Sequence, residues 1–117
     1  MELVFFLALL IKHAIVDIGV QRQLGWMGKE HYWRKRPHLH YGGHGIGTAI
    51  VLLSSGIVPA IIAGVLDWIV HWHIDCAKAK INNYLEIDAS NKNYWWLLTL
   101  DQIFHYITYF IIILLFI

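Results

Sequence analysis

The chain has 117 residues, of which 58% are hydrophobic and 15% are charged, with a formal net charge of +1. A soluble domain of this length cannot bury so much apolar surface, so the composition argues against a soluble protein and favours a single domain in a lipid bilayer. The small net charge argues against a nucleic-acid partner. The single cysteine, Cys76, excludes an intrachain disulfide, and we expect it to be a small buried residue.

The first predicted element is a membrane helix over residues 2–20. Residues 2–11 are apolar apart from Glu2. No basic segment precedes them and no small-residue cleavage site follows, so we expect this helix to be retained rather than removed as a signal peptide. A polar loop over residues 21–37 comes next, and it carries Arg22, Lys29, Arg34, Lys35 and Arg36.

The middle of the chain, residues 38–84, is long enough for two passes through a bilayer at about 20 helical residues each. The segment SSGIVP at residues 54–59 combines a turn-forming Ser-Ser-Gly with Pro59, and proline is tolerated in the first turn of a helix. We therefore predict a tight hairpin between helices over residues 38–56 and 58–84. The rival interpretation is one bent helix over residues 44–70.

The last predicted helix covers residues 94–117, after a polar loop over residues 85–93. The fold class is therefore predicted to be all-α, a polytopic membrane protein with one four-transmembrane-helix bundle over residues 1–117. Basic loops stay cytoplasmic, and four spans place both polar loops on the same side of the membrane, whereas the bent helix would separate them. We expect an inner-membrane protein with both termini outside the cytoplasm.

Histidine and aspartate stand four residues apart in the first, third and fourth predicted helices, and the second contributes a histidine. Residues four apart lie on one face of a helix, so each such pair points in one direction. In the predicted topology all of them fall at a similar depth, in the cytoplasmic half of the membrane. These candidate site residues are His13 and Asp17 in the first helix, His44 in the second, His71 and Asp75 in the third, and Asp101 and His105 in the fourth.

A charged side chain inside a membrane costs a few kcal/mol unless it faces the bundle interior and pairs there. A single His-Asp pair is commonly an internal hydrogen-bonded pair, but several at one depth favour a shared polar site. Imidazole and carboxylate are ligands of Zn, Fe and Mn, so the expected cofactor is one of these divalent ions. We expect Asp67 to pair with a neighbouring helix and Gln21 and Gln102 to orient ligands. Four further histidines are expected at the interface or in supporting positions: His31, His38, His40 and His73.

The segments KHAIVDIGVQ, GWMGK, HWHIDCAKAKIN and LDQIFHYITYF together resemble a family of small four-helix membrane proteins of phages and bacteria whose function is unknown. The resemblance covers nearly the whole chain. Its most specific parts are the H-x-x-x-D of residues 71–75 and the D-Q-x-x-H of residues 101–105. It implicates the seven candidate residues together with Gln21, Lys80 and Gln102. The extra histidines at positions 38 and 40 leave open which histidine of the second helix points inward.

The pattern of His and Asp in several membrane helices is also similar to bacterial inner-membrane metal-dependent hydrolases, as an analogy only. One predicted function is therefore metal-dependent hydrolysis of a lipid-linked or phosphorylated substrate at the cytoplasmic leaflet. The alternative is a non-enzymatic accessory subunit of a larger membrane complex or a homo-oligomer. An ion or proton conductor ranks last, because residues 110–117 are wholly apolar and no polar path continues through them. The expected partner in each case is the lipid bilayer, with no nucleic acid.

Overall fold

The structure is a computed structural model that describes residues 1–24 and 27–117. The described part is all-α. Its helices are α1 (Glu2–Ala14), α2 (Gln21–Leu24), α3 (His38–Val51), α4 (Ile57–Tyr84) and α5 (Lys92–Phe116), with a π-helical segment η1 (Ile15–Gly19) and a 3-10 turn η2 (Leu53–Ser55). Trp26, in the GWMGK segment that carried part of the resemblance, lies outside the described residues.

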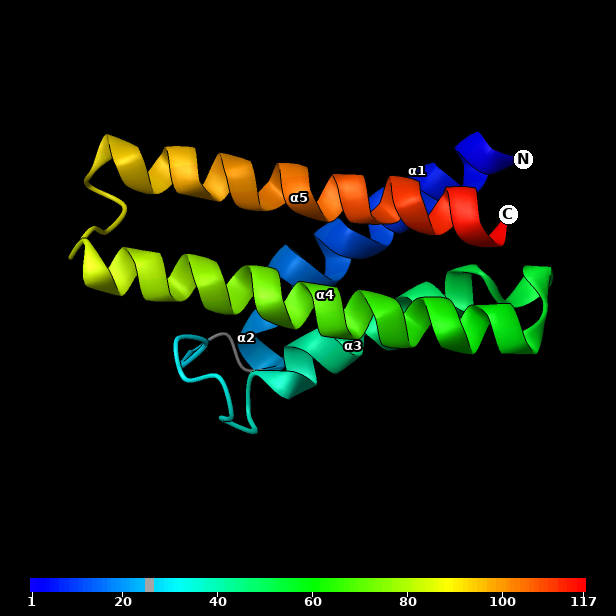
Figure 1. The fold of residues 1–117 in the computed structure, drawn as a ribbon, viewed down its shortest axis with the longest axis horizontal. Helices are drawn as coiled ribbons and strands as arrows, with labels where there is room; N and C mark the ends of the chain where they lie inside the picture. Colours follow the sequence, from blue (N-terminus) through cyan, green and yellow to red (C-terminus); the bar gives the residue numbers. More distant parts are fainter. Residues whose placement is uncertain (25–26) are drawn as a thin grey trace.

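The four long helices run side by side along the bundle in alternating directions (Figure 1). Both chain termini and the turn η2 lie at one end, and the connection between α4 and α5 lies at the other. The loop between α2 and α3 lies against the side of the bundle rather than beyond its end. The structure therefore has the hairpin predicted at residues 54–59, and a single bent helix over residues 44–70 is wrong.

The hairpin forms where the sequence supplies its special backbone geometry. Gly56 has a φ of +115°, a conformation that a side chain disfavours, and it directly precedes α4. Pro59 occupies the first turn of α4, where its missing N–H leaves no helical hydrogen bond unmade. Asn91 caps α5 by accepting a hydrogen bond of 2.9 Å from the backbone N–H of Asn93.

Helices α3 and α4 pack most closely, and glycine makes this possible. A Cβ added to Gly64 would lie 2.6 Å from the carbonyl oxygen of Gly45, so the two backbones touch where the helices cross. Small residues at a helix crossing are the usual means of close packing in membranes. Gly47, two residues after Gly45 on α3, leaves room for the Lys12 side chain of α1, whose Cγ would lie 2.7 Å from an added Cβ.

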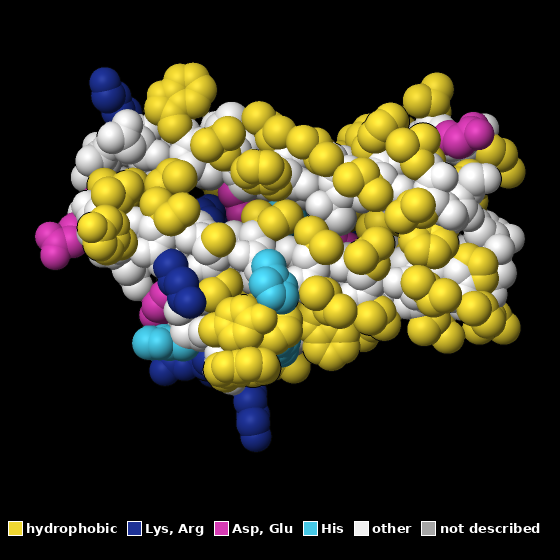
Figure 2. All heavy atoms as spheres, in the orientation of Figure 1, with side chains coloured by type: hydrophobic (Ala, Val, Ile, Leu, Met, Phe, Trp, Pro, Cys, Tyr) yellow, Lys and Arg dark blue, Asp and Glu magenta, His cyan; other side chains and the backbone are white. Residues whose placement is uncertain are grey.

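The interior of the bundle has an apolar half and a polar half. The apolar half lies toward the end that holds the termini, and its buried residues are Leu9, Leu52, Ala60, Ala63, Tyr109, Ile112 and Ile113. The polar half contains buried histidines, aspartates and lysines from all four long helices. The outer surface is largely apolar, with yellow side chains over most of the face shown in Figure 2.

Two of the described helices, α4 and α5, are long and apolar enough to cross a membrane. The expectation of four spans is not supported, because α1 has 13 residues and α3 has 14. At about 1.5 Å per residue they are about 20 Å long, shorter than the roughly 30 Å hydrocarbon core. Both α-helices end earlier than the predicted ranges 2–20 and 38–56, because α1 is followed by the π-helical η1 and α3 by the 3-10 turn η2.

Candidate metal centre

Three buried histidines and one aspartate converge in the polar half of the bundle. His40 and His44 lie on one face of α3, four residues apart, and His71 reaches the same point from α4. All three imidazoles are fully buried. Asp17 comes from η1, where the π-helical backbone widens the chain just before its turn into α2. Such π-helical segments are frequent at functional sites.

The distances within this group suit coordination of one ion. Asp17 Oδ1 lies 3.3 Å from Nε2 of His40, 3.5 Å from Nε2 of His44 and 3.8 Å from Nε2 of His71. Atoms that hold one tetrahedral ion at about 2.0–2.1 Å are separated by about 3.3–3.4 Å. The four side chains are Asp17, His40, His44 and His71, and we call them the four-residue cluster.

The same imidazole nitrogens are not used by hydrogen bonds. Nε2 of His40, His44 and His71 makes no hydrogen bond of acceptable geometry to any residue that the structure describes. Buried polar atoms in folded proteins nearly always have a partner, and an exception calls for an explanation such as a ligand or ion. A bound cation would satisfy all three nitrogens and the carboxylate together.

A second group overlaps the first. His71, Asp75 and His105 also bring one ligand atom each within 4.8 Å of one another. Asp75 Oδ1 lies 3.1 Å from His105 Nε2, and Asp75 Oδ2 lies 3.5 Å from His71 Nε2. The rings of His44, His71 and His105 form a continuous stack, with centroids 3.6 and 3.9 Å apart. Because both groups use His71, they form one site rather than two separate ones.

His13 lies next to this site but has a different role. Its Nδ1 is 2.7 Å from the Tyr109 hydroxyl, and its Nε2 is 2.9 Å from Gln102 Oε1. The Gln102 amide nitrogen in turn donates to Asp17 and Asp101, at 3.4 and 3.0 Å. Both His13 nitrogens are therefore engaged by the protein, so His13 positions Gln102, and through it the carboxylates, rather than offering a free ligand atom.

Two buried lysines, which the sequence analysis did not assign to the site, balance its negative charge. Lys12 of α1 forms a 2.8 Å ion pair with Asp67 of α4, which confirms that Asp67 pairs with a neighbouring helix. Thr48 donates to the same Asp67 oxygen at 2.6 Å. The Lys12 ammonium also lies 3.1 Å from the Tyr109 hydroxyl and, at the longer distance of 3.5 Å, from His44 Nδ1.

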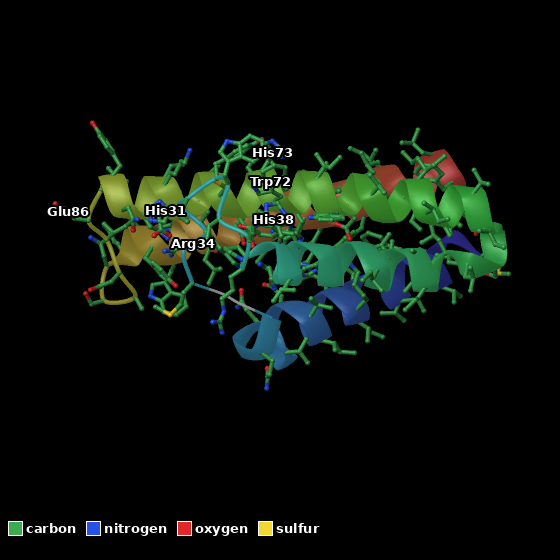
Figure 3. All side chains as sticks on the ribbon, turned by 90° about the horizontal axis from the view of Figure 1, so that it is seen from below. His31, Arg34, His38, Trp72, His73 and Glu86 are labelled. Atoms are coloured by element: carbon green, nitrogen blue, oxygen red, sulfur yellow. The ribbon has the colours of Figure 1, made fainter. Side chains whose placement is uncertain are left out.

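The second lysine enters from the loop between α2 and α3. Lys29 donates to Asp75 Oδ2 and to Gln21 Oε1, both at 2.7 Å. Tyr32 holds this loop on α4, because its hydroxyl is 2.7 Å from His73 Nε2 and its backbone carbonyl accepts a 3.0 Å bond from Trp72. Figure 3 shows Trp72 and His73 where the loop passes α4, with Glu86 far away at the end of the bundle.

The structure places the seven sequence-predicted residues in one polar interior, although their role as metal ligands stays a prediction. His44, His71, Asp75, Asp101 and His105 are buried, and Asp17 is partly exposed at 18% of its side chain. The expectation that His40 is interfacial is wrong, because His40 is fully buried and belongs to the four-residue cluster, whereas a supporting role for it stays a prediction. Its spacing of four residues from His44 was the available signal. His38 is half-buried, and its Nδ1 accepts a 3.2 Å bond from Trp68, whereas His31 and His73 are exposed.

Three other residues named from the sequence lie outside the cluster. Lys80, implied by the resemblance, is exposed on α4 with its ammonium 5.8 Å from the centre of the Tyr32 ring. Cys76 is buried, as expected, and belongs to neither group of possible ligands. Gln21 acts on the carboxylates only indirectly, since it binds the Asp17 backbone carbonyl at 2.8 Å and accepts from Lys29.

Comparison with known proteins gives a family but no activity. The family described as "Protein of unknown function (DUF3307)" matches residues 5–117, so the chain belongs to that family. No curated protein and no solved structure matches the chain. The function must therefore be argued from the side chains of the site.

Proposed function

We propose that this member of the DUF3307 family is an integral membrane protein that binds one divalent transition-metal ion in its interior. One observation carries the proposal: among the described residues, the buried Nε2 atoms of His40, His44 and His71 have no hydrogen-bond partner, and they lie 3.3–3.8 Å from Asp17 Oδ1. Three histidines and one carboxylate are a ligand set used for Zn, Fe and Mn. The ligands would be the four-residue cluster, with Asp75 and His105 beside it.

The apolar surface of the protein supports a location in the bilayer as much as the length of α4 and α5 does. Only 28% of the most apolar 18-residue stretch of α4 and 33% of that of α5 are buried inside the protein. Most of the apolar surface of these two helices therefore needs another apolar environment. Large apolar side chains are also exposed on the shorter helices, among them Leu7 and Ile11 on α1 and Ile46 and Ile50 on α3. We therefore place α1 and α3 in the bilayer beside the two spanning helices, with the membrane thinned around them.

The proposed orientation has the loops before α3 and before α5 in the cytoplasm and both termini outside. Basic residues gather in and near these loops, and Figure 1 has the termini and the turn η2 at the opposite end of the bundle from the α4–α5 connection. Reporter fusions at Lys35, Ser54 and Ser90 test this arrangement. We expect cytoplasmic signals at Lys35 and Ser90 and an external signal at Ser54. Signals from opposite sides at Lys35 and Ser90 would overturn it.

The proposed activity of the ion is hydrolysis at the cytoplasmic leaflet. A divalent ion held by the four-residue cluster would polarise a water molecule for attack on an ester or phosphoester. Asp17 is the one member of the four-residue cluster with an exposed fraction, so water and substrate would approach from its side. Micelle-borne esters and phosphomonoesters, assayed with and without added Zn, test the activity. Asp17→Asn should abolish any metal-dependent turnover, and turnover that persists after chelation would contradict the hydrolase.

Metal content tests the binding itself without needing a substrate. Purified protein is stripped with a chelator, reloaded with Zn, Fe or Mn, and measured by elemental analysis. We expect one ion per chain in the wild type and a loss of the ion in His44→Ala and His71→Ala. His31→Ala is the matched control, because His31 is exposed on the loop. The proposal would be refuted if the wild type bound no ion, or if His44→Ala and His31→Ala retained equal amounts of ion.

A second candidate function is an accessory subunit that packs against another membrane protein. A groove of about 530 Å³ runs between α3 and α4, and it is lined by small and apolar residues such as Gly42, Gly43 and Ala49. Small residues allow a further helix to approach closely in a membrane. Gly43→Leu should prevent such packing, because it puts a large side chain into the groove. Cross-linking in membranes, compared between Gly43→Leu and wild type, distinguishes this function from the first.

A further inference from the structure

The groove between α4 and α5 differs from the one between α3 and α4 because it has an ion pair in its wall. Its volume is about 380 Å³, and Figure 2 shows a hollow between the two helices with dark blue and magenta atoms in its depth. Most of the lining is apolar, including Ile74, Ile81, Leu97 and Phe104. Lys78 and Asp101 supply the charges.

The ammonium of Lys78 makes fewer hydrogen bonds, and a longer one to its carboxylate, than those of Lys12 and Lys29, the other two lysines of the polar interior. An ammonium has three N–H donors, and bonds from an ammonium to a carboxylate are normally about 2.7–2.9 Å long. Lys12 reaches Asp67 at 2.8 Å and has two further contacts, and Lys29 has two acceptors at 2.7 Å. Within the described residues Lys78 has one acceptor, Asp101 Oδ2, at 3.2 Å. Its donors therefore have capacity for another acceptor, and its side chain is 22% exposed.

Asp101 does not depend on Lys78 alone. The same oxygen accepts a 3.0 Å bond from the Gln102 amide, and Asp101 Oδ1 lies 3.4 Å from His105 Nε2. An anion that binds Lys78 would therefore leave the Asp101 carboxylate with partners on its own helix α5. The cation of the pair is the member that is free to accept a ligand from the groove.

From this arrangement we infer that the α4–α5 groove binds a single-chain amphiphile with an anionic headgroup, carboxylate or phosphate. The chain lies along the apolar lining, and the headgroup accepts hydrogen bonds from Lys78. A volume of about 380 Å³ is at the small end of ligand sites, which suits one chain rather than the two of an ordinary phospholipid. Since Asp101 also adjoins His105, the bound headgroup is adjacent to the polar interior.

This inference does not rest on the metal. The groove and Lys78 belong to neither group of possible metal ligands, so binding is measured on chelator-treated protein. If metal binding fails and amphiphile binding holds, the groove is a lipid site in a metal-free protein. If the reverse occurs, the metal proposal survives and the groove does not.

The test uses the full chain in a bulky neutral detergent, with dodecyl phosphate, dodecanoate and dodecanol as probes at equal chain length. Binding is followed by native mass spectrometry and by competition with a fluorescent fatty acid. We expect both anionic probes to bind at least about tenfold more tightly than dodecanol, the scale of one charge-assisted hydrogen bond. A difference between phosphate and carboxylate identifies the preferred headgroup.

Two variants separate the charge from the groove. Lys78→Met should remove the preference for anionic probes and leave the affinity for dodecanol unchanged. Ala77→Leu, which fills the groove, should weaken all three probes. Lys80→Met is the matched control, since Lys80 lies over the Tyr32 ring and outside the groove. The inference is overturned if the wild type binds dodecanol and the anionic probes equally well, a result that does not depend on whether Lys78→Met folds. It is also overturned if folded Lys78→Met keeps the preference for anionic probes.

Discussion

The ammonium of Lys12 lies 2.8 Å from the carboxylate of Asp67, and this ion pair joins α1 to α4 in the buried interior. The alkyl chain of Lys12 passes over Gly47 of α3, where any side chain at position 47 would collide with it. The pair therefore fixes the positions of three helices at once. It also separates the four-residue cluster from the apolar half of the core.

Breaking this pair from one side should be more damaging than removing it whole. Lys12→Met or Asp67→Leu alone leaves a buried charge without its partner, which should lower the free energy of unfolding by about 3–5 kcal/mol. The double variant Lys12→Met/Asp67→Leu leaves neither charge and should recover most of this loss. Thermal unfolding in detergent of the four proteins gives the coupling energy. Additive effects of the two changes would show that the ion pair does not couple the helices.

The crossing of α3 and α4 predicts a sharp difference in stability between substitution of a glycine at the crossing and substitution of a glycine away from it. Gly64→Ala puts a Cβ 2.6 Å from the carbonyl oxygen of Gly45, so the helices must separate, at about 1–3 kcal/mol. Gly42→Ala is the control on α3, because nothing lies within 4 Å of its added Cβ. Gly42→Ala should be neutral or slightly stabilising in the same melts. Equal stability of the two variants would contradict the close crossing.

Asp75 and Asp88 offer a comparison between a buried and an exposed aspartate. Asp75→Ala removes the carboxylate that pairs with Lys29 and contacts His105 Nε2, and each buried polar group that loses its partner costs about 1–3 kcal/mol. Asp88 is exposed in the loop before α5, where hydrogen bonds from Ser90 lower its pKa and keep it ionised at neutral pH. Detergent melts should therefore show a large loss for Asp75→Ala and little change for Asp88→Ala. Equal melting temperatures would place Asp75 outside any buried network.

Lys29 should weaken metal binding, because it brings a positive charge to the site. Its ammonium is 2.7 Å from Asp75 Oδ2, which itself lies 3.4 Å from His40 Nε2 and 3.5 Å from His71 Nε2. Lys29→Met should raise the affinity for Zn by about tenfold or more, measured by competition with a chromogenic chelator. Lys35→Met, an exposed change in the same loop, should have no effect. A lower affinity in Lys29→Met would show that the lysine helps to hold the ion instead.

Metal affinity should also fall in acid. The histidines bind an ion only in the neutral form, so protons compete with the ion for Nε2 of His40, His44 and His71. Chelator competition between pH 8 and pH 5 should give a steadily rising dissociation constant for the wild type. A dissociation constant that does not change with pH would exclude the histidines as ligands.

Much of the architecture was predictable because local patterns determine it. The apolar runs predicted the long helices, and Ser54 to Pro59 predicted the hairpin, since glycine and proline each permit one particular backbone geometry. The spacing of four between His71 and Asp75, and between Asp101 and His105, correctly predicted that each pair shares a face. The ends of the first two long helices were less predictable, because each is followed by a π-helical or 3-10 segment, η1 or η2, whose different hydrogen-bond pattern the sequence did not reveal.

Lys12 and Lys29 were missed in the sequence analysis for the same reason. Lys12 stands within an apolar segment, and nothing near it in sequence indicates Asp67, which is 55 positions away. Lys29 belongs to a basic loop, where its charge was interpreted as a topology signal shared with Arg34 and Lys35. Helical periodicity relates residues within one helix, but it does not specify where a long lysine side chain from another segment will reach.

Lys29 has a consequence for how the protein matures. The ammonium neutralises Asp75 from within the chain, so the chain carries its own counterion for this buried carboxylate. Small metal domains such as zinc fingers fold only with the ion, because binding the ion supplies their folding free energy. Under the proposed function, this chain would not need the ion to compensate Asp75, so folding would come first and loading with a cation would be a later, separate event.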